Sequence, residues 1–79
     1  MSLTYCGIIL NIMVALCRVS KGSNEYQDLL IIQDIADQFD GSISADITAL
    51  LKAFRDRTNL RLSLDDLYVY FSNMGVFKI

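Results

Sequence analysis

The side chain best placed for chemistry is Ser44, which follows the turn-forming residues Asp40 and Gly41. It precedes an amphipathic pattern that predicts a helix over residues 45–58. A serine at a helix N-terminus can carry an anionic group, because free backbone N–H groups and the helix dipole favour negative charge there. Serine is also a preferred N-cap. A modification site and a plain helix cap are therefore both open interpretations of Ser44.

Other reactive side chains are few. The chain has no His, and its two cysteines, Cys6 and Cys17, lie eleven positions apart without a CxxC pair. Zinc binding and Cys-His catalysis are therefore excluded. On one helix these thiols would be about 16 Å apart, too far to pair with each other. We expect reduced thiols in the core and no enzymatic activity.

The turn around Gly41 can also be compared with the centre of a calcium-binding EF-hand loop. In that register two ligand positions fall on Ala36 and Gln38, and position twelve falls on Ile47 instead of Glu. Calcium loops need carboxylate oxygens at such positions. The sequence therefore predicts no metal site.

The composition predicts one small helical domain over residues 1–79. Hydrophobic residues make up 53% of the chain, which has no Pro and four Gly. This composition fits a compact helical fold, with apolar surface left over for a partner. The net charge of −2 argues against binding to nucleic acid through phosphate contacts.

Charge is divided along the chain. Residues 23–51 contain six acidic residues and no basic one, whereas Lys52, Arg55, Arg57 and Arg61 follow within ten positions. Separated charges of this kind are typical either of solvated helix faces or of a docking surface.

Four segments have helical patterns, which predicts a small all-α four-helix bundle. Three of these segments, 25–39, 45–58 and 64–71, repeat apolar residues at three- and four-residue spacing. Before the second helix, Gly22 is the expected C′ residue and Ser23 or Asn24 is the expected N-cap. We expect Asn59 to end the third helix and Ser63 to cap the fourth.

The first segment, Leu3 to Cys17, is apolar around most of its circumference. Leu3, Cys6, Leu10, Met13 and Cys17 recur at three- and four-residue spacing, and further apolar residues lie between them. Such a helix is either central to the fold or shared between subunits, so a homo-oligomer through this helix is one expectation. The run is too short for a membrane span. We expect a buried helix in a cytoplasmic protein.

The C-terminal residues have an alternative interpretation. Residues 67–71 and 76–79 could form a β-hairpin, which would give a mostly α winged helix. Lys52, Arg55 and Arg57 would then approach DNA phosphates. The Ser63 cap favours a fourth helix, and the acidic first half of the chain argues against DNA.

Residues 40–71 resemble the acyl and peptidyl carrier proteins. The resemblance rests on Gly41-x-x-Ser44, on the helix with Ile47 and Phe54, and on Leu62-Ser63, which follow Ser44 by eighteen and nineteen residues. It implies that Ser44 carries 4′-phosphopantetheine and presents an acyl or aminoacyl group to partner enzymes. Ile43 and Ala45 stand where the family has Asp and Leu.

The alternative function is that of a small helical interaction protein, of inhibitor, immunity or regulatory type. Its support is the small size, the divided charge and the surplus of apolar residues. For either function we expect a protein partner. The candidate docking residues all lie on the predicted third helix: Ile47, Lys52, Arg55 and Arg57.

Overall fold

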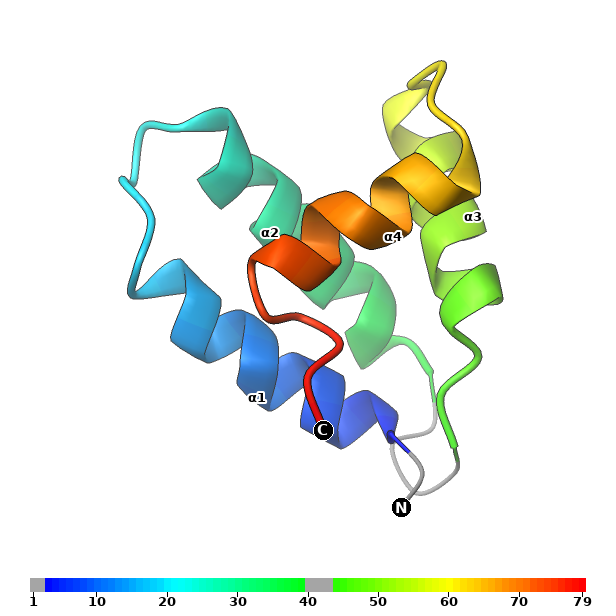
Figure 1. Ribbon diagram of the computed structural model, residues 1–79, viewed down its shortest axis with the longest axis horizontal. Helices are drawn as coiled ribbons and strands as arrows, with labels where there is room; N and C mark the ends of the chain where they lie inside the picture. The colour runs from blue at the N-terminus through cyan, green and yellow to red at the C-terminus, as the bar shows by residue number, and fades with distance from the viewer. Residues whose placement is uncertain (1–2, 40–43) are drawn as a thin grey trace.

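The computed structural model describes residues 3–39 and 44–79, which fold into four helices (Figure 1). Their bounds are α1 Tyr5–Leu16, α2 Asn24–Asp37, α3 Ile47–Thr58 and α4 Leu64–Asn73. Within these residues no β-strand is present, and one isolated bridge joins Thr4 to Ser44. The prediction of an all-α four-helix protein is confirmed.

Every helix begins at a side-chain N-cap. Thr4, Ser23, Asp46 and Ser63 have extended backbone angles, and each side-chain oxygen accepts a hydrogen bond from the backbone N–H three residues later. These bonds satisfy N–H groups that have no partner inside the helix. The predicted caps Ser23 and Ser63 are confirmed.

Two predictions about helix ends were wrong. Helix α3 begins at Ile47 instead of Ala45, and its N-cap is Asp46 rather than Ser44. Helix α1 ends at the cap Cys17 in right-handed helical conformation, so Gly22 is not its left-handed C′ residue. The left-handed end of α3 at Asn59 is confirmed, with φ of 55°.

Consecutive helices pack on one another around a single apolar core. At its centre the rings of Phe54 and Phe71 meet edge to face, with centroids 4.9 Å apart. Both side chains are fully buried. Edge-to-face contact aligns the positive rim of one ring with the negative face of the other. This pair joins α3 to α4.

The C-terminal residues form a helix and a return segment, so the favoured fourth helix is confirmed and the alternative of a hairpin and winged helix was wrong. Helix α4 ends at the cap Met74, and Gly75 has φ of 85°, a conformation that reverses the chain. Residues 76–79 then run back across α1 (Figure 1). The Asn11 amide donates hydrogen bonds to the carbonyls of Val76 at 3.0 Å and Lys78 at 2.7 Å.

Helix α1 buries a different face from the expected one. Its core residues are Tyr5, Ile8, Ile12 and Ala15. Both cysteines are free, as predicted, but they are exposed instead of buried. Among the helices that the structure describes, none is long and apolar enough to cross a membrane.

Candidate functional site

Ser44 lies in an extended segment that the N-terminal residues hold in place. The Ala45 N–H donates to the carbonyl of Leu3 at 2.7 Å, and the Asp46 N–H donates to the Tyr5 hydroxyl at 2.9 Å. The Tyr5 ring stacks on Phe39, with centroids 4.8 Å apart. Through these contacts the N-terminal segment holds the residues that precede α3.

The surroundings of Ser44 differ from those expected of a serine on the first turn of a helix. Ser44 is exposed and lies two residues before the N-cap. The Asp46 carboxylate accepts the Ala49 N–H at 3.0 Å, in the place where a helix N-terminus would bind an anion. A phosphate on Ser44 would lie two residues away from this negative charge. Residues 40–43, the preceding turn of the carrier resemblance, lie outside the described residues.

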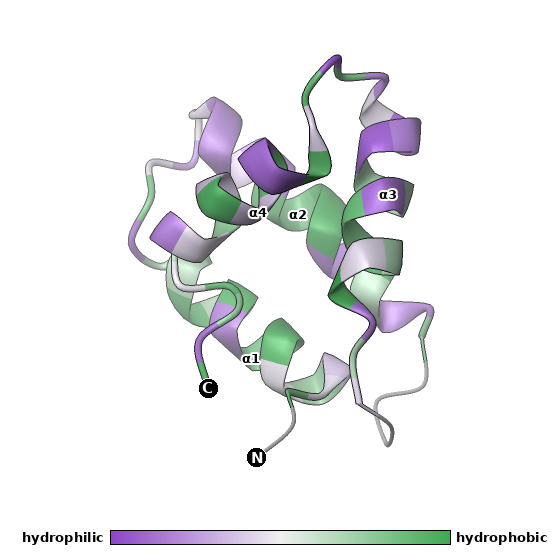
Figure 2. Cartoon of the chain, turned by 45° about the vertical axis from the view of Figure 1, so that its right-hand side comes forward, coloured by the Kyte–Doolittle hydropathy of each residue, from purple (hydrophilic) through white to green (hydrophobic). Residues whose placement is uncertain are grey.

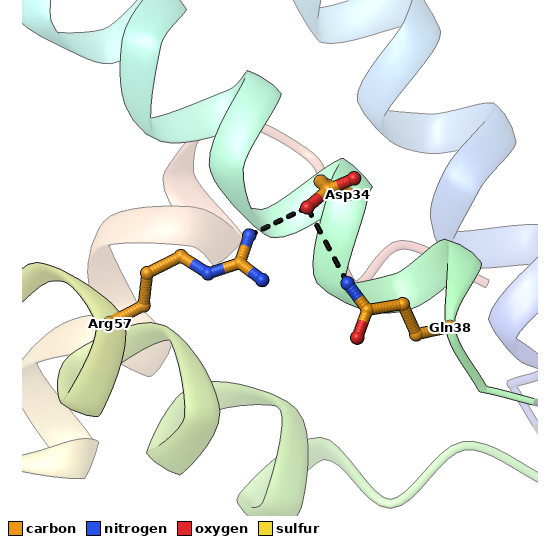
Figure 3. Close-up of polar contacts among 3 residues, drawn as sticks. All are labelled: Asp34, Gln38 and Arg57. Carbon is orange, nitrogen blue, oxygen red and sulfur yellow. Dashed lines mark hydrogen bonds and ion pairs between the residues drawn. The ribbon is translucent and has the colours of Figure 1, made fainter.

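The candidate docking residues of α3 do not form one basic surface. Arg57 donates to Asp34 on α2 at 2.7 Å, and Gln38 donates to the same carboxylate oxygen at 3.5 Å (Figure 3). Lys52 is separated from Arg57 by about 140° around the helix axis, since each residue turns the helix by about 100°. The Arg57 guanidinium is thus used within the fold.

The other three docking candidates also differ in exposure. Lys52 is exposed, whereas Arg55 and Ile47 are partly buried, and Ile47 packs against the core. Helix α3 carries both hydrophilic and hydrophobic residues, whereas α1 carries mostly hydrophobic ones (Figure 2). The surface of α3 is therefore that of a solvated helix with one exposed lysine.

Tyr70 is an ionisable group whose surroundings change its pKa. Its hydroxyl donates to the Asp28 carboxylate at 2.6 Å, which links α4 to α2. Burial raises the pKa of Tyr70 well above its usual value, and the hydrogen bond to Asp28 and the negative charge of that carboxylate raise it further. The phenol therefore stays protonated at neutral pH, as a structural link between helices.

The side of α1 that faces away from the core is apolar. We define the α1 apolar face as five exposed residues: Cys6, Leu10, Met13, Val14 and Cys17. Leu10 is 61% exposed, and Met13 and Val14 are each 51% exposed. The sequence has no charged residue before Arg18. An amphipathic surface helix normally places charged or polar residues on this side.

The α1 apolar face borders a hollow and a basic rim. Leu10 lines a groove of about 270 Å³ between α1 and the C-terminal segment, with Leu3, Gly7 and Ile79 among its other lining residues. Arg18 and Lys78 lie beside Val14 at the edge of a second hollow. An apolar centre with charges at its edge is the usual arrangement of a protein-binding surface.

The sequence pattern identifies most residues of this face, but it does not show that they are exposed. Cys6, Leu10, Met13 and Cys17 were identified as one stripe, and the stripe was expected to be buried. A second set of apolar residues follows helical spacing on the opposite side of the helix: Tyr5, Ile8, Ile12 and Ala15. With apolar residues on both sides, periodicity does not tell which side meets the core.

Residues 3–39 and 44–79 contain no group of three His, Cys, Asp or Glu side chains placed to hold a metal ion. No family model, curated protein or solved structure matches the chain.

Proposed function

We propose that this chain is a non-catalytic protein-binding domain that acts through the α1 apolar face. The observation that carries the proposal is the exposure of Leu10, Met13 and Val14, each more than half exposed, on a helix side without a charged residue. Monomeric proteins rarely leave a contiguous apolar surface of this kind uncovered. The face is supplied by a helix whose other side is anchored in the core.

The expected affinity follows from the area still open to water. Full burial of a Leu, Met or Val side chain contributes roughly 1.5 to 3 kcal/mol, so covering the exposed half of each contributes about 1 kcal/mol. Part of this gain is lost to the entropy of association. The three side chains alone therefore support weak binding, which the groove beside Leu10 and the basic rim can strengthen.

The test is site-specific photo-crosslinking in the cells that produce the protein. A p-benzoyl-phenylalanine residue replaces Leu10, which is 61% exposed, and a matched control replaces Val69 on α4, which is 55% exposed. We expect a light-dependent protein adduct at position 10 and none at position 69. No adduct at position 10, or equal adducts at both positions, would contradict the proposal.

Carrier function at Ser44 is the second proposal, and one observation favours it: Ser44 is exposed, so a modifying enzyme can reach its hydroxyl. It ranks second because Asp46, and not Ser44, occupies the helix cap. Incubation with a phosphopantetheinyl transferase and coenzyme A should add one 4′-phosphopantetheine to the wild type and none to Ser44→Ala. An unchanged wild-type mass, with a control carrier modified, would exclude this function.

A further inference from the structure

We infer that the partner of the α1 apolar face is a second copy of this chain, packed antiparallel along α1 about a twofold axis. The inference rests on the proposed protein-binding function of this face. It is carried by the spacing of four exposed residues on one side of the helix: Cys6, Leu10, Met13 and Cys17.

This spacing is symmetric about a point between Asn11 and Ile12. The intervals are four, three and four residues, so that reversing the helix places each member of the set opposite another member. In an antiparallel pair, Leu10 of one copy faces Met13 of the other, and Cys6 faces Cys17. Alternating three- and four-residue spacing is the pattern by which two helices interlock their side chains. These four residues of the face are therefore complementary to themselves in the reversed direction.

The charges on α1 are compatible with this arrangement, and Lys78 of the basic rim is held beside Asn11, at least about 100° around the helix from Leu10 and Met13. A twofold interface brings the same surface from both copies together, so a charge near the axis would repel its own copy. The α1 apolar face has none. The nearest charge along α1, Arg18, would lie about 20 Å along the axis from its symmetry mate, beyond the range of strong charge repulsion at physiological salt.

The ends of α1 favour the antiparallel direction. Helix α1 has no acidic residue in its first turn and no basic residue in its last turn, whereas each of the other three helices has at least one of these. An antiparallel neighbour places the positive end of one helix dipole beside the negative end of the other. A parallel neighbour would place like ends together.

The size of the contact predicts a reversible dimer. Helix α1 has 12 residues and is therefore about 18 Å long. A contact along one such helix buries on the order of 400 Å² per copy, below the area of standard stable interfaces. We expect monomers at low micromolar concentration and dimers at about 100 µM or more. Leu10→Glu should raise the dissociation constant at least about tenfold, because it buries a carboxylate opposite Met13.

The two cysteines report the direction of packing. The single variants Cys6→Ser and Cys17→Ser are treated with diamide, which takes two hydrogen atoms from a pair of thiols as their disulfide forms. Both cysteines are exposed, so neither change should disturb the core. Each variant alone should stay uncrosslinked, because its remaining thiol faces serine. An equal mixture of the two should form a disulfide between Cys6 of one copy and Cys17 of the other.

The outcomes separate this inference from the proposed function. Disulfide formation in either single variant alone would contradict antiparallel packing. A molar mass that stays at the 8.9 kDa monomer value at about 1 mM protein, with no disulfide in the mixture, would exclude the second copy altogether. In that case an adduct between position 10 and a different protein would still support the proposed function. If position 10 also forms no adduct, both this inference and the proposed function are contradicted.

Discussion

Replacing the two candidate cap residues before α3 discriminates between the sequence prediction and the structure. Asp46→Ala removes the carboxylate that accepts the Ala49 N–H at 3.0 Å, whereas Ser44→Ala removes an exposed hydroxyl two residues before the cap. The bridge between Thr4 and Ser44 is made by the backbone, so it survives the second change.

The expected magnitude follows from the geometry of this cap. Loss of an N-cap side chain typically costs about 1 kcal/mol, within a range of roughly 0.5 to 2. For a chain of this length a loss of about 1 kcal/mol lowers Tm by roughly 4 to 8 °C. Ser44→Ala should change Tm by much less. Asp46→Asn keeps a hydrogen-bond acceptor and loses the charge, so it should fall between the two.

The assay is thermal and urea unfolding followed by far-ultraviolet circular dichroism at neutral pH. Wild type and the three variants are compared at one low protein concentration, so that self-association does not contribute to the differences. A larger destabilisation by Ser44→Ala than by Asp46→Ala would refute the assignment of the cap. Equally small effects of both changes would show that neither side chain caps α3 in solution.

Four further changes test other parts of the fold. Tyr70→Phe should lower the free energy of unfolding by about 1 to 2 kcal/mol, since it removes a bond to the Asp28 carboxylate. Because the pKa of Tyr70 is raised in the folded state, its hydrogen bond contributes fully to the free energy of unfolding below about pH 10 and progressively less above it. In urea titrations the difference between wild type and Tyr70→Phe should therefore shrink as pH rises past about 10. Asn11→Ala should release residues 76–79 from α1, seen as faster hydrogen exchange there, and cost about 1 to 2 kcal/mol. Gly75→Ala should cost on the order of 1 kcal/mol in thermal unfolding, because φ of 85° disfavours a side chain. Arg57→Ala should change stability by less than about 1 kcal/mol, since its ion pair is solvent-exposed.

The sequence predicted which side of a helix is buried wherever apolar residues occupy one side only. Leu50, Leu51 and Phe54 on α3, and Leu67 and Phe71 on α4, are all buried as their spacing indicates. The competing hairpin over the last residues was wrong because the Ser63 cap and the packing of Phe71 on Phe54 favour a helix there.

The start of α3 could not be located from local pattern alone. Ser44 and Asp46 are both favourable N-caps and lie two residues apart. Contacts with the N-terminal segment decide which residue caps the helix, because Leu3 and Tyr5 hold the backbone of residues 45 and 46 in extended form. Such contacts between distant segments have no signature in the local sequence.

The exposed side of α1 was the other feature that the sequence left undecided. Its two apolar sides have similar spacing, and only the assembled core shows that Ile8 and Ile12 are buried while Leu10 and Met13 face solvent. The same observation changes the meaning of the stripe. Residues that were expected to stabilise the fold become the candidate binding surface.

The most direct test of that surface is a dilution series recorded by ¹⁵N–¹H correlation NMR, from about 1 mM to about 10 µM. We expect amide shifts that change with concentration along the α1 apolar face, around Cys6, Leu10, Met13 and Cys17, and that are lost in Leu10→Glu. Concentration-dependent shifts confined to α3 or α4 would contradict a binding role for this face. Spectra of α1 that do not change over the whole range would contradict self-association through it.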